Sequence, residues 1–320
     1  MYTRIALVVL ATGALITGCS DGKTMGPSAR RASPHLTPQA KPLTEAQARA
    51  IFERSERVNN EANAKVSDPL LRSNEIGPML EVDLAGNKRI RSKKQKKISP
   101  FLHAHTQFFI PRNANPAWFG VLGSVGKNTE IQIMLDTGGG VYKNVLGCWL
   151  GAGQKVPAIA RDADGFATAV TTGTAVGVGT KIAAYLTAAA AGKHAPGGIK
   201  SGRLTSRVAK SWARSVARIN AGHRWSGGVT WTARPDSVYA LKTADGGAVV
   251  FGAETETENY TATQPNVWFE PDSRYFGLGP KRYFVNFSGE LVWQHATYVP
   301  SQGPASVLAD SANATRATGS

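Results

Sequence analysis

Two histidines separated by one residue, His103 and His105, are the pair whose type and spacing first suggest chemistry. In an extended segment, residues i and i+2 project from the same face, so both imidazoles could approach one metal ion. A stable site usually needs a third ligand, and no Cys, Asp or Glu lies within ten residues of the pair. The sequence therefore predicts two surface histidines and neither a metal site nor a cofactor.

The segment Asp136-Thr137-Gly138 resembles the active-site loop of aspartic proteases. In those enzymes two aspartates about 3 Å apart share a proton, so a second such loop must come from the same chain or from a symmetric dimer. The chain contains no second Asp-Thr-Gly or Asp-Ser-Gly. Because Gly139 and Gly140 follow directly, the segment favours a hairpin turn before a strand at Val141, and a homodimeric protease remains the alternative.

Other reactive motifs fail on their spacing. Cys148 lies within the apolar run 144–150, where a thiol usually behaves as a small buried hydrophobe. Ser124 lacks the glycine two residues earlier that a nucleophile elbow requires. The Gly-rich run 173–181 fits neither the phosphate-loop nor the dinucleotide pattern. No catalytic residue is therefore predicted.

Charged residues cluster in two places. The densest basic run comprises Lys88, Arg89, Arg91, Lys93, Lys94, Lys96 and Lys97. We expect a loop there that is either simply solvated or contacts anionic lipid or phosphate-bearing wall polymers. Glu254, Glu256 and Glu258 alternate along a strand as an acidic row on one face, which would either meet a basic partner or protect an exposed edge strand.

The N-terminus has the order of an export signal. Arg4 precedes the apolar run 5–16, which is too short to span a bilayer as a helix, and small residues follow. The tetrad Ile16-Thr17-Gly18-Cys19 resembles the bacterial lipobox. This resemblance implies cleavage after Gly18 and lipid on Cys19, which would hold the protein on the outer face of the cytoplasmic membrane.

Overall charge and cysteine content restrict the partners. The 37 Lys and Arg residues exceed the 22 Asp and Glu residues, and the excess is spread along the chain instead of forming one basic groove. Together with export, this spread argues against nucleic acid as a partner. With Cys19 lipidated, Cys148 has no partner in the chain, so the protein must fold without a disulfide.

Periodicity predicts an α+β protein in which helices precede an antiparallel sheet, and in which this order occurs twice. Helices are expected at 44–65, 68–77, 164–191 and 206–221, with the apolar stripe Val208, Trp212, Val216 and Ile219 on the last, and strands fill 101–150 and 228–298, with a turn at Ser288-Gly289. We therefore expect a signal peptide (1–18), a flexible tether (19–42), two tandem α+β domains (43–154 and 155–299) and a disordered tail (300–320).

Short motifs at 58–63, 70–71 and 75–78 resemble a family of uncharacterised actinobacterial lipoproteins. The helix-then-sheet layout is also similar to the nuclear-transport-factor-like (cystatin-like) α+β cone. The lipoprotein family brings no assigned activity, so the resemblance implies location and fold only. Taken together, these patterns favour a lipid-anchored binding or interaction module without enzymatic activity. A small-pocket enzyme and an envelope scaffold that uses basic surfaces remain the alternatives.

Overall fold

Three helices open the folded part of the chain: α1 (Glu45–Lys65), α2 (Asp68–Asn74) and α3 (Gly77–Ser92). The computed structural model describes residues 42–93, 100–112, 114–170 and 172–320. At the start of α1, the Thr44 hydroxyl accepts a hydrogen bond from the Gln47 amide, and the Gln47 side chain accepts one from the Thr44 amide. This reciprocal capping confirms the helix start expected from the sequence. The helix that starts at Asp68 ends at Asn74, just before Gly77-Pro78, and Pro78 lies in the first turn of α3, where proline is tolerated.

The strands form one antiparallel sheet of nine members. Its order is β1-β3-β4-β5-β11-β10-β9-β7, with β8 also paired to β9. Their bounds are β1 (Ala104–Phe109), β3 (Trp118–Val125), β4 (Asn128–Asp136), β5 (Tyr142–Leu150), β7 (Trp225–Ala233), β8 (Tyr239–Lys242), β9 (Ala248–Ala262), β10 (Asn286–Val299) and β11 (Ser306–Gly319). Two short strands, β2 (Pro111–Arg112) and β6 (Ala167–Thr168), pair in parallel beside it.

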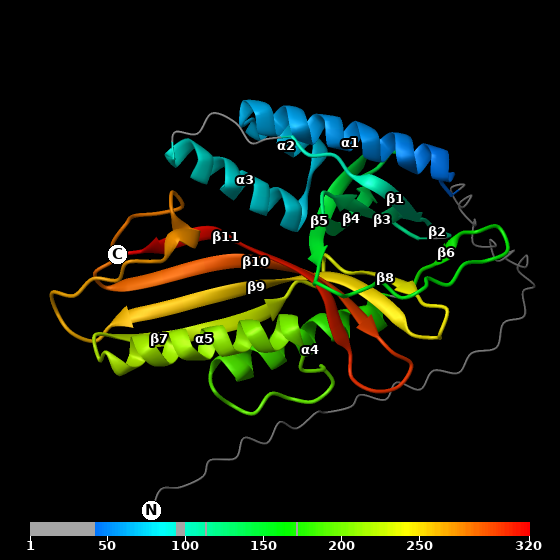
Figure 1. The fold of residues 1–320 in the computed structure, drawn as a ribbon. Coiled ribbons are helices and arrows are strands. Elements are labelled where there is room, and N and C mark those ends of the chain that lie inside the picture. The colour runs from blue at the N-terminus through cyan, green and yellow to red at the C-terminus, as the bar shows by residue number, and fades with distance from the viewer. Residues whose placement is uncertain (1–41, 94–99, 113, 171) are drawn as a thin grey trace, which may run out of the picture. The chain divides into compact units, whose positions relative to one another are not determined.

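Helices cover both sides of this sheet (Figure 1). The first three helices lie along one side, where α3 packs on β5, β10 and β11. The other side is covered by α4 (Thr172–Ala190) and α5 (Arg203–Ala221), which pack on each other and on β7. The α+β class and the antiparallel sheet expected from the sequence are therefore confirmed.

The two halves of the chain share this sheet, whereas the sequence predicted two tandem domains. β5 of the first half pairs with β11 at Leu150↔Ala309 and Trp149↔Asp310, and Ala40–Ser320 form one compact unit. The predicted disordered tail 300–320 is instead largely β11, a strand held between β5 and β10. Ser288 and Gly289 lie inside β10, so the turn predicted there is also absent.

A large apolar core lies between α4, α5 and the sheet. It includes Ile182 and Leu186 of α4, Trp212 of α5, and Trp231 and Trp293 of the sheet, all nearly inaccessible to water. Burying such large side chains is the main source of stability in a chain that has no disulfide among its described residues. None of the described helices is long and apolar enough to cross a bilayer.

Candidate functional site

A cavity of about 410 Å³ lies between α5 and the sheet, and we call it the α5 cavity. Its lining comprises Arg207, Val208, Ser211, Trp212 and Ser215 of α5, Glu256 of β9, Leu291 and Trp293 of β10, Ala312 of β11, and Asp272 and Arg274 at the 3-10 helix η1 (Ser273–Tyr275). Arg207 and Ser211 are exposed at its mouth. Both its size and its mixture of aromatic and polar groups are typical of small-molecule sites.

The apolar stripe of α5 holds this helix over the sheet. Val208, Trp212 and Val216 pack into the large core, and Ile219 packs against a neighbouring apolar cluster. The Trp212 ring meets the Trp231 ring edge-on, with 6.5 Å between the ring centroids. The stripe predicted from the sequence is therefore confirmed, and it fixes one wall of the α5 cavity.

The acidic row of β9 forms the floor of this region instead of an exposed edge. Alternation along the strand places Glu254, Glu256 and Glu258 on one face, as predicted, but the three residues are only 0, 2 and 4% exposed. The reason is the sheet order, because β9 lies between β7 and β10 and its acidic face is covered by helices. The prediction of a solvent-facing row is therefore wrong.

Glu256 is the residue in this row that faces the cavity with an unsatisfied group. Its Oε1 atom is buried and has no hydrogen-bond partner among the described residues. Burial and the nearby Glu258 carboxyl raise the pKa of Glu256 to about 8, while Arg274 and the indole N–H of Trp231 oppose the increase. At neutral pH this carboxyl therefore keeps its proton and can donate a hydrogen bond into the cavity.

At one end of the cavity, Arg274 is already paired. Its Nη2 lies 2.6 Å from Asp272 Oδ2 and 3.2 Å from Glu258 Oε1, and Glu258 also accepts a hydrogen bond from the Tyr275 hydroxyl. Burial raises the pKa of Glu258 to about 7, although Arg274 opposes this increase. The Arg274 guanidinium also lies 4.6 Å from the centroid of the Trp212 ring, which is a cation–π geometry. This end of the cavity is thus internally satisfied and rigid.

Beyond Glu256 the same face carries a buried histidine. His295 Nε2 lies 3.2 Å from Glu254 Oε1, and its Nδ1 lies 2.8 Å from the Thr297 hydroxyl. Gly252 lies beneath this ring, since a Cβ atom at that position would fall 2.9 Å from His295 Nε2. Burial raises the pKa of Glu254, and His295 opposes this increase. Neither residue lines the α5 cavity, so both support its floor from outside.

A second polar cluster lies in the first half of the chain. His103 is held between Glu56 and Glu130, with each ring nitrogen 2.8 Å from a carboxylate oxygen, and its side chain is only 2% exposed. The expectation of a surface histidine at this position is therefore wrong, whereas His105 is exposed. The adjoining hollow measures about 10 Å³, which is room for a water molecule at most. This cluster stabilises the fold and offers no ligand site.

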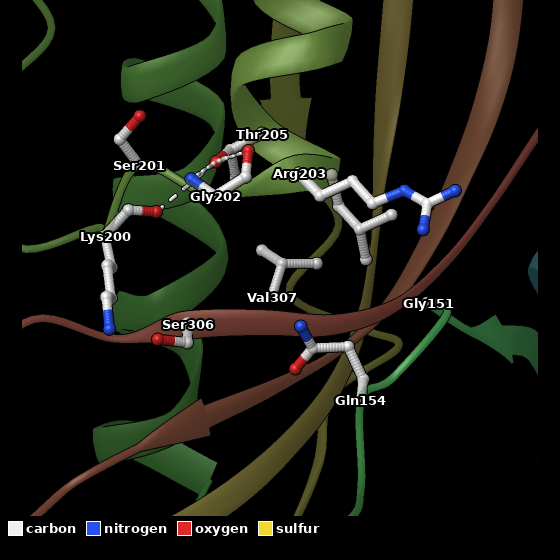
Figure 2. A pocket seen from close by; sticks show the side chains of 10 residues that line it. Gly151, Gln154, Lys200, Ser201, Gly202, Arg203, Thr205, Ser306 and Val307 are labelled. Carbon is white, nitrogen blue, oxygen red and sulfur yellow. Dashed lines mark hydrogen bonds between the residues drawn. The ribbon is translucent and has the colours of Figure 1, made fainter.

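Two other hollows are less suited to a ligand. The pocket of about 150 Å³ in Figure 2 lies at the start of α5, where Gly202 N–H donates to the Thr205 hydroxyl and Thr205 bonds to the Lys200 carbonyl. Polar groups there serve to cap the helix. A larger groove of about 690 Å³ between α4 and β7 is lined mainly by Ala and Thr side chains and lacks converging charged groups.

The basic run predicted to be a loop begins inside α3. Arg89 donates to the carbonyl of Ala314, and Arg91 forms two hydrogen bonds with the Asp68 carboxylate. Two of the seven cations therefore have structural partners. Lys88 and Lys93 stay at the end of the helix, while Lys94, Lys96 and Lys97 lie outside the described residues, as do Gly18 and Cys19.

The remaining motifs have structural roles. The Asp136 carboxylate accepts a hydrogen bond from the Gly138 amide, and the Thr137 amide bonds to the Val141 carbonyl, so this segment is the hairpin turn between β4 and β5. Cys148 is buried and free, and burial raises the pKa of its thiol well above the usual range. The described residues contain no group of His, Cys, Asp and Glu arranged to hold a metal ion.

Sequence reasoning missed most of the α5 cavity. Asp272 and Arg274 lie in an irregular segment without periodicity, and Trp293 is indistinguishable from any core aromatic. Two signals were available. One was the apolar stripe of α5, which forms a wall of the cavity, and the other was the row Glu254, Glu256 and Glu258, whose three carboxylates share one face of a strand.

Comparison with known proteins places the chain in a family. A family model described as Domain of unknown function (DUF8094) matches residues 39–319. The chain is 26% identical to an uncharacterised lipoprotein of Streptomyces coelicolor over 314 residues, which cover 92% of this chain and 87% of that protein. No solved structure matches, so the nuclear-transport-factor-like cone is not confirmed. Because the family model spans most of its length, the chain belongs to the DUF8094 family.

Proposed function

We propose that this protein is a lipid-anchored binding protein on the outer face of the cytoplasmic membrane, and that its ligand occupies the α5 cavity. The anchor is supported by the order of charge, apolar run and Ile16-Thr17-Gly18-Cys19 at the N-terminus, and by the description of the Streptomyces relative as a lipoprotein. Lipid on Cys19 would keep the folded part beside the membrane, where small envelope molecules are available.

One observation carries the assignment of binding. Glu256 is 2% exposed, lines an open cavity, and has one buried oxygen, Oε1, that forms no well-aligned hydrogen bond with the described residues. Burying such a group lowers stability unless something else satisfies it, so a polar ligand in this cavity would offset that cost, which supports a binding role.

A plug in the mouth of the cavity tests this assignment. In Ser211→Trp, the new side chain would occupy the opening between α5 and the η1 segment, whereas Ala217→Trp places the same side chain at an exposed position of α5 outside the lining. We expect the low-molecular-mass fraction of the producing cell envelope to raise the Tm of the wild type and of Ala217→Trp, but not that of Ser211→Trp. Equal shifts in all three proteins would contradict the proposal.

The anchor is tested by intact-mass spectrometry of protein extracted from its native membrane. We expect the wild type to begin at Cys19 and to carry added diacylglyceryl mass. Cys19→Ala should lack that mass and should leave the membrane fraction, because a protein without acyl chains loses its main source of membrane affinity. An identical mass and distribution for the two proteins would rule out the anchor at this position.

A further contact with anionic lipid is supported by the outer face of α5. Lys210, Arg214 and Arg218 are exposed there, and Lys88 and Lys93 add positive charge at the end of α3. Each such cation can contribute about 1 kcal/mol at an anionic surface. We expect Cys19→Ala protein to sediment with phosphatidylglycerol vesicles at low salt but not with phosphatidylcholine vesicles.

Replacing Lys210, Arg214 and Arg218 with Gln should weaken this binding at least tenfold, as expected for about three such contacts. Addition of salt should weaken the binding of the parent protein in the same direction. Binding that is equal for both vesicle types, or insensitive to salt, would exclude the contact. Competition by soluble wall polymers would show whether phosphate-bearing polymers occupy the same face.

A further inference from the structure

We infer that the α5 cavity takes a neutral, polyhydroxylated ligand of about the size of one or two sugar rings. This inference rests on the proposed binding function and names the chemical class of its ligand. It follows from three properties of the lining: an apolar aromatic wall, hydroxyl and carboxyl groups that converge from opposite sides, and an Asp272–Arg274 pair whose charges already neutralise each other.

The apolar wall suits the C–H face of a sugar. Trp293, Leu291 and Val208 line the cavity together with Trp212. Aromatic rings provide large, rigid apolar surfaces at a small cost in conformational entropy. A hydroxylated ring that presents its C–H face to this wall leaves its hydroxyl groups pointing toward the polar side.

The polar groups converge from two elements. Arg207, Ser211 and Ser215 are spaced four residues apart and so follow one stripe of α5 along the cavity. Serine hydroxyls both donate and accept hydrogen bonds, as sugar hydroxyls do. Glu256 faces the cavity from β9. A ligand held between these walls can satisfy the Glu256 oxygen that lacks a well-aligned partner among the described residues.

Charge disfavours ionic ligands of either sign. The face of Trp212 that could attract a cation is occupied by Arg274, at 4.6 Å from the ring centroid, and Arg207 adds positive charge at the mouth. An anion would approach the Asp272 carboxylate, which lines the same end of the cavity. Arg274 cannot serve an anion freely, because both Asp272 and Glu258 already bind it.

The state of Glu256 sharpens the prediction. Its pKa of about 8 means that it is neutral at pH 7 and acts as a donor. The groups that set this pKa face it from β9 (Glu258), from the η1 segment (Asp272 and Arg274) and from β7 (the Trp231 indole). Arg207 of α5 also lines the cavity. Binding of a neutral ligand should therefore weaken as the pH rises through about 8.

Three monosaccharides that differ in charge test the ligand class. Glucose is neutral, glucosamine is a cation and glucuronate is an anion, and each is titrated into the full chain while tryptophan fluorescence is recorded. We expect glucose to change the fluorescence in the millimolar range, and we expect at least tenfold weaker binding of the other two. Ser211→Trp should abolish the response, and Glu53→Gln, which alters an exposed carboxyl of α1 on the other side of the sheet, should leave it unchanged.

Glu256→Gln and Glu256→Leu separate the possible roles of the carboxyl. The amide keeps a donor without ionising, so Glu256→Gln should bind glucose within about threefold of wild type and lose the pH dependence, whereas Glu256→Leu should bind at least tenfold more weakly. Tighter binding of glucosamine or glucuronate would overturn the ligand class while supporting a binding cavity. Absence of a response to all three probes would overturn the inference, and the proposed function would fall only if the envelope fraction also gave no shift.

Discussion

Replacing His103 with alanine is expected to lower the free energy of unfolding by about 3–5 kcal/mol at pH 7, because it breaks a buried charge pair by removing one partner. Burial lowers the pKa of His103, but hydrogen bonds to Glu130 and Glu56 outweigh this effect and raise the pKa to about 9. The ring is therefore an imidazolium at neutral pH. Its loss would leave Glu130, which is 5% exposed, without its cation. Urea unfolding monitored by circular dichroism measures the change.

A matched control is available two residues along the chain, in strand β1. His105 is exposed, and its backbone φ of 52° is a conformation that asparagine tolerates. His105→Asn should therefore change the free energy of unfolding by less than about 0.5 kcal/mol. Adding Glu130→Gln to His103→Ala should restore part of the loss, since it removes the stranded charge. An equal effect of the two histidine substitutions would show that the ion pair contributes no stability.

The pH dependence of this group has a definite sign. Because the folded-state pKa is raised from 6.5 to about 9, the contribution of His103 is fully present below pH 6.5 and is lost as the pH rises through about 9. The stability of the wild type should therefore decline across that interval, and the decline should be smaller in the alanine variant.

Replacing Glu256 with leucine should have the opposite effect, raising the free energy of unfolding by about 1–4 kcal/mol at pH 8, because an apolar side chain of similar size replaces an unsatisfied buried carboxyl. Each kcal/mol corresponds to about 2–4 °C in Tm for a domain of this size class. The raised pKa of Glu256 means that its penalty is absent below pH 4.5, grows above that value, and is complete above about pH 8. The leucine variant should lack this loss.

Glu270→Leu provides the control for the chemistry of the substitution. Glu270 is exposed and lies outside the α5 cavity, so its replacement should stay within about 0.5 kcal/mol of wild type at every pH. A Glu256→Leu protein that is less stable than wild type would mean that the carboxyl stabilises the fold through a partner, and the functional interpretation of Glu256 would lose its basis.

Local signals in the sequence predicted helices well and strand partners poorly. The capping pair Thr44 and Gln47 and the apolar stripe that contains Trp212 depend only on residues close in sequence. They can therefore be recognised without knowledge of the fold. β11 was missed because its many Ala, Ser and Asn residues have little intrinsic β preference. They form a strand because β5 and β10 supply hydrogen-bond partners on both sides.

Gly289 and the glutamate row of β9 were misinterpreted for the same reason, which is that contacts with residues distant in the sequence decide their structure. Gly289 indicates a turn by its type, but it lies in β10 because the Tyr275 hydroxyl packs where a Cβ atom would be. The alternating row at Glu256 predicted correctly that its members share a face. Whether that face meets water depends on the order of the strands and on α5, and neither can be inferred from the strand itself.

The most direct measurement is the Tm of wild type and Glu256→Leu at pH 7, each with and without the low-molecular-mass envelope fraction. If Glu256 is retained for binding at a cost in stability, the leucine variant should have the higher Tm alone, and the fraction should raise only the Tm of the wild type. A lower Tm for the leucine variant, or equal shifts in both proteins, would contradict the assignment of the α5 cavity as the ligand site.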